Sequence, residues 1–253
     1  MTRPLADRIM RGVRPRVMRD FAPPPVPVAP DLWALDRRLR LPPGLTLPTR
    51  TFVVRLPSRG LLVVSPPPPE AGGLDALDAL GAVEEILVPN SYHYVYAEAF
   101  AARYPHAVLR VAPGLRRRVP ELSTGAELGA TAPPAWAGAV AHRILGPVGD
   151  IAEVALLHVA SATLLLTDLA FNMRHFPSRL QGAIWRLSGV PAGFGPSRSA
   201  RLLLLRDRAV AAEFLAGVLT WPFTRVLVAH GDPLETDAAD TFRRAFASYL
   251  PAA

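Results

Sequence analysis

Hydrophobic residues along this chain alternate between the short period of a strand and the longer period of a helix. Strands are expected over 49–56, 61–65, 83–88, 108–111, 140–145, 153–159, 163–167 and 225–229. Helices are expected over 74–80 and 95–104. A third helix is expected after Asp207, with apolar residues at 210, 214, 215 and 218, and a last helix carries apolar residues at 242, 246 and 250. Blocks of strands followed by helices occur twice. This order predicts two sheets back to back with helices outside.

Residues 31–253 are expected to form a single domain, because no linker-like segment interrupts them. Residues 1–30 differ, since an Arg-rich stretch is followed by several prolines, and we expect a solvated, flexible tail there. Contact of this tail with a membrane surface or a partner helix is the alternative. Residues 170–200 are rich in Gly, Pro and aromatics without a clean period, which predicts a long loop with short helical pieces.

The composition is that of a globular protein, with 50% hydrophobic and 19% charged residues. No apolar run reaches the roughly 18 residues that a membrane span requires, and the N-terminus lacks the apolar stretch of a secretory signal. We therefore expect a cytoplasmic protein. Cysteine is absent, which excludes disulfides, thiolate metal sites and cysteine nucleophiles. Any metal must be held by His, Asp, Glu or Asn.

The net charge of +7 is unevenly distributed. All 28 basic residues are Arg, and six of them, with two Asp, lie in the first 20 residues. The rest of the chain is close to neutral, which argues against a phosphate-tracking groove for nucleic acid. A small-molecule substrate or ligand is the expected partner, and recruitment to an anionic surface by the tail is a further alternative. The motifs of serine hydrolases, dinucleotide-binding proteins and P-loop proteins are absent.

Three side chains that can bind a metal, His93, Asp168 and His230, come at or just after the end of an expected strand. Buried strands hold their ends rigidly, so these side chains are expected to converge on one site. Each also has an ordinary structural explanation. Asp168 can cap a turn, His230 can bond to the backbone and His93 can pack on a neighbouring tyrosine. His175 follows Asp168 closely enough to reach the same cleft.

Five segments carry a family resemblance: Val88–His93, Tyr104–Ala107, Ala112–Leu115, Leu166–Asn172 and Val228–Gly231. In this order and spacing they resemble a domain-of-unknown-function family distantly related to the metallo-β-lactamase fold. The resemblance spans nearly all of residues 50 to 250. It implies an α/β fold, an αββα sandwich of the metallo-β-lactamase type with two mixed sheets packed face to face and helices outside. It also implies a metal site at one edge, where strand ends converge.

The resemblance assigns site residues one by one. Hydrolases of this fold carry a first motif His-x-His-x-Asp-His, of which this chain keeps only His93, with Asn90 as a further candidate ligand. A later family His falls near Glu153, the bridging aspartate matches Asp168 and the last ligand matches His230. The aspartate of the first motif has no counterpart. The set suits one divalent ion, Zn, Fe or Mn, and ligand types alone do not choose among them.

Two functions follow from this degenerate motif. The leading hypothesis is a metal-dependent hydrolase-like protein, in which metal-bound water attacks an ester, amide or related bond of an unknown substrate. The alternative is a non-catalytic binding or scaffold protein that retains the fold but has lost the metal site. The sequence leaves the substrate and the oligomeric state open.

Overall fold

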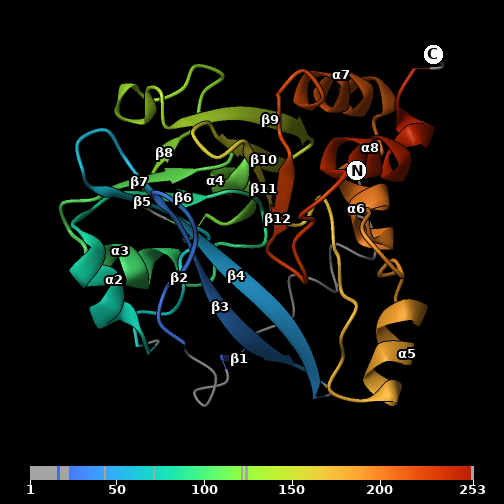
Figure 1. The fold of residues 1–253 in the computed structure, drawn as a ribbon, viewed down its shortest axis with the longest axis horizontal. Helices are drawn as coiled ribbons and strands as arrows, with labels where there is room; N and C mark the ends of the chain where they lie inside the picture. The colour runs from blue at the N-terminus through green and yellow to red at the C-terminus, as the bar shows by residue number, and fades with distance from the viewer. Residues whose placement is uncertain are drawn as a thin grey trace.

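Two β-sheets packed face to face form the centre of the molecule, and helices cover both outer faces (Figure 1). The computed structural model describes residues 16–17, 23–42, 44–70, 72–120, 122 and 125–251. Within these residues the larger sheet has eight strands: β1 (Arg16–Val17), β2 (Val26–Ala29), β3 (Leu32–Leu41), β4 (Leu45–Arg55), β5 (Leu61–Val64), β6 (Val83–Val88), β7 (Val108–Val111) and β8 (Ala126–Glu127). The smaller sheet has four: β9 (Val140–Val148), β10 (Ile151–His158), β11 (Thr163–Leu166) and β12 (Arg225–Val228).

Both sheets are mixed, as expected. The larger sheet runs in the order β1-β3-β4-β5-β6-β7-β8, with β2 beside β3, and is parallel from β5 onward. The smaller sheet runs β12-β11-β10-β9, with only β11 and β12 parallel. Parallel strands place their carboxyl ends at one edge. The residues that follow β5, β6, β11 and β12 can therefore meet there.

Three hydrophobic cores separate the layers. Leu62, Leu87, Leu156 and Leu227 belong to the core between the two sheets. A second core packs the larger sheet against α2 (Leu74–Leu80), α3 (Ala97–Arg103) and α4 (Leu115–Arg118). The third packs the smaller sheet against α6 (Arg198–Leu203), α7 (Arg208–Val218) and α8 (Ala238–Ala245). This four-layer arrangement confirms the predicted αββα sandwich.

Strands β3 and β4 form a long two-stranded ribbon that projects past the rest of the sheet toward α5 (Arg179–Leu187) (Figure 1). Sequence reasoning did not predict β3 and began β4 four residues late. Three arginines, at 37, 38 and 40, interrupt the apolar alternation of β3, and Pro48 lies inside β4. Pairing between the strands outweighs the low strand propensity that the arginines and Pro48 indicate, because ten residue pairs join β3 and β4.

The predicted tail needs a correction. Val26–Ala29 pairs with β3, and so does Arg16–Val17, so these residues belong to the larger sheet instead of a free tail. The remainder of the predicted tail up to residue 22 lies outside the described residues. The segment 170–200 contains α5, of nine residues, and the start of α6, of six, within a longer loop, in agreement with the expected short helical pieces. Short 3-10 turns occur at Pro134–Trp136 and Ala247–Tyr249.

Among the helices of the described ranges, none is both long enough and apolar enough to span a bilayer.

Candidate metal centre

The two sheets touch at the edge where the parallel strands end. The backbone N–H of Val154, in β10, donates to the carbonyl of Pro89, directly after β6, over 2.8 Å. Asn90 and Glu153 form an isolated bridge beside it. Side chains that follow strands of different sheets are therefore held within reach of one another, which is what a site at this edge requires.

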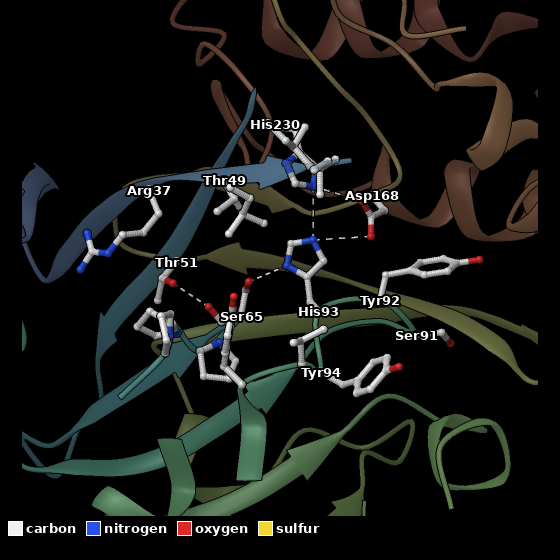
Figure 2. A pocket seen from close by; sticks show the side chains of 18 residues that line it. Arg37, Thr49, Thr51, Ser65, Ser91, Tyr92, His93, Tyr94, Asp168 and His230 are labelled. Atoms are coloured by element: carbon white, nitrogen blue, oxygen red, sulfur yellow. Dashed lines mark hydrogen bonds and ion pairs between the residues drawn. The ribbon is translucent and has the colours of Figure 1, made fainter. Parts of the chain in front are cut away.

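His93, Asp168 and His230 meet at this edge (Figure 2). His93 Nε2 lies 3.3 Å from His230 Nε2 and 3.5 Å from Asp168 Oδ2. His230 Nε2 lies 3.2 Å from Asp168 Oδ1. The side chains are 9%, 15% and 4% exposed for His93, Asp168 and His230. The three are thus sheltered without being sealed, and a small ligand can reach them.

Each histidine ring is fixed from behind through its other nitrogen. His230 Nδ1 lies 2.8 Å from the carbonyl oxygen of Pro48, in β4, and its ring stacks on Phe171 with centroids 4.8 Å apart. His93 Nδ1 lies 2.5 Å from Ser65 Oγ, just after β5. An Nδ1–H that donates to a carbonyl leaves the Nε2 lone pair facing the site. The His230 ring is therefore oriented as a metal ligand requires, and the His93 ring is oriented in the same way when its Nδ1–H donates to Ser65 Oγ.

Asp168 carries the negative charge of the cluster. Burial would raise the pKa of Asp168, but the adjacent His93 and the hydrogen bonds with both rings hold it well below its usual range. The carboxylate is therefore ionised at neutral pH, the form in which it can bind a cation.

Asn90 and Glu153 are not part of this group of facing ligand atoms. Asn90 is fully buried, and its Oδ1 accepts from the backbone N–H groups of Tyr92 (2.8 Å) and His93 (2.9 Å). Its Nδ2 donates to Asp168 Oδ2 and to Glu153 Oε2, each over 2.8 Å. Asn90 thus shapes the turn that carries His93 and links the two carboxylates.

Glu153 lies behind Asn90 with no exposed surface. Its Oε1 accepts from the N–H and hydroxyl of Thr167 and from the N–H of Leu169, which are the residues on either side of Asp168. Burial and the repulsion of Asp168 raise the pKa of Glu153 to about 8, against the hydrogen bonds donated to it. Glu153 therefore holds the backbone on both sides of Asp168.

The other histidines lie apart from the cluster. His175 is 88% exposed and pairs with Asp232 over 3.2 Å, at the mouth of a second cavity instead of the cleft of His93. His142 bonds to the carbonyl of Gly129, and His158 bonds to Ser161 Oγ. Sequence reasoning did not select Ser65. The signal was present, since Ser65 is a polar residue directly after the apolar run Leu61–Val64.

A family model matches residues 30–194, about two thirds of the chain. The chain belongs to the family described as Domain of unknown function (DUF4336). The match covers strands β3 to β11, His93 and Asp168, and it stops before His230. No curated protein matches the chain in sequence.

Solved structures place this family member in the metallo-β-lactamase fold. The putative diflavin flavoprotein A 5 fragment from Nostoc sp. PCC 7120 superposes with a TM-score of 0.61 at 12% identity, over 93% of this chain and 96% of that one. The metal-soaked Flv1 flavodiiron core from Synechocystis sp. PCC6803 gives 0.63 at 10% identity, over 93% of this chain and 61% of that one. The metallo-β-lactamase FIM-1 from Pseudomonas aeruginosa, in its mono-zinc form, gives 0.57 at 10% identity, over 92% and 100%. The predicted fold and family resemblance are confirmed.

Proposed function

We propose that this chain is a metal-dependent hydrolase-like protein that holds one divalent ion between His93, Asp168 and His230. Two of the similar structures are described as metal-soaked and mono-zinc, so the fold accommodates metal at low sequence identity. The fold alone does not carry the proposal, because folds host many functions. The geometry of the three side chains carries it.

The separations of the facing atoms fit a tetrahedral site. Ligands bonded at about 2.0–2.1 Å to a tetrahedral ion lie about 3.3 Å from each other. The three observed separations are 3.2, 3.3 and 3.5 Å. A set of two imidazoles and one carboxylate with an open position suits Zn, Fe or Mn. Asn90 and Glu153, which the sequence had offered as further ligands, act in this proposal as supports for Asp168 and for the turn of His93.

A bound ion would supply a Lewis acid and lower the pKa of a water molecule, which is the chemistry of ester and amide hydrolysis. The chain's own residues orient the three candidate ligands. Pro48 and Ser65 orient the two rings, and Asn90 holds Asp168 through Oδ2. The apolar wall of the adjoining cavity excludes bulk water from one side of the cluster.

The close approach of the two rings favours one alternative, a non-catalytic binding or scaffold protein. At 3.3 Å, a proton on His93 Nε2 can be shared directly with His230 Nε2, which would satisfy the cluster without a cation. If both rings carry their protons on Nδ1, two lone pairs and a carboxylate face each other and repel unless a cation lies between them. The tautomer of His93 therefore separates the two functions.

Elemental analysis of the untagged protein tests the proposal. We expect about one equivalent of Zn, Fe or Mn per chain, lost in the folded variants His230→Gln and Asp168→Asn. His106→Gln is the matched control, because His106 is an exposed histidine away from the cluster. A parent protein that is free of metal and takes up none of the three added ions would contradict the metal site. The non-catalytic binding or scaffold protein would then be the remaining hypothesis.

Nitrogen NMR of the imidazole rings provides the second test. In the metal-loaded protein we expect both rings to carry the proton on Nδ1, with Nε2 shifted by the ion. A proton on His93 Nε2 under these conditions would contradict the proposed ligand set. Hydrolysis is then tested on a panel of esters, amides and lactones, with the His230→Gln variant as the inactive reference.

A further inference from the structure

The β3–β4 ribbon lies between two cavities of opposite character. Alternate side chains of a strand point to opposite faces, so the ribbon presents a different set of residues to each cavity. One face lines a cavity of about 160 Å³ that ends at the candidate metal centre, and it contributes Leu39, Leu41, Leu47 and Thr51 (Figure 2). The opposite face contributes Asp36, Arg38, Thr46, Pro48 and Arg50 to a second cavity. Arg37 and Thr49 border both.

Charged side chains gather in the second cavity, where those of the ribbon are joined by Arg174, His175 and Asp232. The first cavity is walled instead by the three leucines and by the proline run after β5, Pro66, Pro67 and Pro68. Among the described residues that line it, the only acidic and guanidinium side chains are Asp168 and Arg37. Asp168 belongs to the candidate metal centre. The character of the remaining wall therefore depends on where the charge of Arg37 lies.

The guanidinium group of Arg37 does not open onto the first cavity. Arg37 is 2% exposed, and its Nε is buried. Its Nη1 donates to the carbonyls of Pro23 (3.1 Å) and Asp36 (2.7 Å), and its Nη2 donates to the carbonyl of Gly72 (2.7 Å). Figure 2 shows this head group pointing away from the two histidines. Arg37 therefore adds the apolar stem of its side chain to the wall.

Three hydroxyl groups of the wall are engaged within the protein. Thr51 Oγ1 donates to the carbonyl of Ser65 over 2.6 Å, and Ser65 Oγ lies 2.5 Å from His93 Nδ1. Ser91 Oγ donates to the carbonyl of Asp150 over 3.3 Å. A ligand in this cavity therefore meets apolar surface along its body and polar groups at the His93 end, an arrangement typical of a small-molecule site. A charged group on the ligand body would lose its hydration there without gaining a partner.

An engineered apolar cavity of about 150 Å³ holds one benzene molecule, which indicates the size of ligand that this cavity can take. We propose that the substrate is an uncharged ester or amide whose apolar acyl chain, of about six carbons, lies between the leucines of the ribbon and the proline run. Its carbonyl group lies at the His93 end. The inference rests on the proposed hydrolase function and adds the class of substrate. Water supplies the hydroxyl that joins the acyl carbon and the proton that leaves with the alcohol or amine.

Calorimetric titration of the parent protein with methyl esters tests the inference. The protein is first treated with EDTA, so that the cavity is measured without metal and without hydrolysis. We expect the dissociation constant to fall about fourfold with each added carbon from methyl propanoate to methyl hexanoate, and to level off for longer chains. Monomethyl adipate, in which a carboxylate replaces the terminal methyl group of methyl hexanoate, should bind at least about tenfold more weakly.

Leu47→Asn and Leu45→Asn form a matched pair on β4. Both leucines are partly buried and pack against the same small core, but only Leu47 lines the cavity. We expect Leu47→Asn to weaken the binding of methyl hexanoate about tenfold and Leu45→Asn to leave it within about twofold. In the metal-loaded protein, kcat/KM for the methyl esters should rise with acyl length over the same range.

Several outcomes would overturn the inference. Equal affinities for methyl hexanoate and monomethyl adipate, no gain in affinity or in kcat/KM with acyl length, no binding of any ester, or equal losses in the two variants would each do so. The comparisons among esters use the parent protein and do not depend on the folding of a variant. A parent that shows the expected preference but takes up no metal supports the apolar site and contradicts the hydrolase. A parent that takes up metal without this preference does the reverse.

Discussion

Asn90 Nδ2 lies 2.8 Å from Asp168 Oδ2. The same amide is also 2.8 Å from Glu153 Oε2, so one neutral side chain separates two buried carboxyl groups. No cation among the described residues forms an ion pair with Glu153. The arrangement depends on Asn90 donating to both sides, which makes this position intolerant of a third acidic group.

The isosteric change Asn90→Asp tests this dependence. It keeps an oxygen for the backbone N–H groups of Tyr92 and His93 but replaces the amide donor by a carboxylate between the Asp168 carboxylate and the Glu153 carboxyl group. We expect the free energy of unfolding at pH 7 to fall by roughly 3–5 kcal/mol, measured by urea denaturation. Glu153, whose pKa is raised to about 8, is already protonated at pH 7. The loss should therefore shrink near pH 5 as the introduced carboxylate binds a proton, and grow above pH 8 as Glu153 ionises. A variant as stable as the parent at pH 7 would show that Asn90 does not hold the carboxylates apart.

Ser65 contacts the ring of His93 and should tune metal affinity without holding the fold together. Ser65→Ala removes the hydroxyl that contacts His93 Nδ1 and holds the ring in place. We expect the zinc affinity to fall about 10- to 100-fold, measured by competition with a chromophoric chelator. Ser91→Ala is the matched control, because Ser91 lines the same cavity but bonds to the carbonyl of Asp150. Equal losses in both variants would contradict a specific role for Ser65.

Gly231 allows the chain to turn directly after His230. Its φ is +120°, and a Cβ at this position would overlap the carbonyl oxygen of Asn172. We expect Gly231→Ala to lower the free energy of unfolding by at least about 2 kcal/mol and to abolish metal uptake by displacing His230. Gly193→Ala serves as the control, because no atom lies near its added Cβ. Intact metal binding in Gly231→Ala would mean that the backbone can rearrange without moving the ligand.

His158 should make the fold sensitive to acid. It is 1% exposed, and burial lowers its pKa in spite of the attraction of Asp31. As the pH falls through about 6.5, the unfolded chain binds a proton that the native chain does not, so stability is lost on the acid side. We expect the free energy of unfolding of the parent, relative to that of His158→Gln, to fall between pH 7 and pH 5. Glu153, whose pKa is raised to about 8, acts in the opposite direction in both proteins and cancels in this comparison.

His106→Gln provides the comparison for this titration, since His106 is exposed. Urea denaturation of the three proteins at four pH values between 5 and 8 gives the slopes. Parallel slopes for the parent and His158→Gln would contradict the assignment. His142, whose pKa is also lowered by burial, and Glu153, whose pKa is raised, both contribute to the slope that remains in the variant.

Much of the site was accessible from sequence because its ligands follow short apolar runs. Asp168 and His230 each come two residues after a four-residue strand that ends in three apolar residues, and this pattern places them at a sheet edge whatever the partner strands are. The same pattern marks Ser65, which was overlooked because serine is not a metal ligand. The contact between His230 and Pro48 could not be predicted, since a backbone carbonyl leaves no mark in the sequence.

The misassignments have a common physical origin. The β3 strand was missed because Arg37, Arg38 and Arg40 read as a solvated surface, whereas Arg37 is buried against backbone carbonyls. Glu153 was offered as a ligand because its contacts with Asn90 and Thr167, which come from other strands, leave no mark near it in the sequence. In each case, a polar residue is accommodated by contacts distant in sequence, which local patterns do not record.

Asp168 and His230 are 62 residues apart along the chain, and His93 and His230 are 137 apart. No local segment of the described chain holds two members of the cluster, so a nascent or partly folded chain has no preformed chelate. An ion captured here can report only on a molecule whose two sheets have already docked. Metal content per chain is therefore also a quality check on recombinant material, one that separates the completed fold from collapsed forms with similar secondary structure.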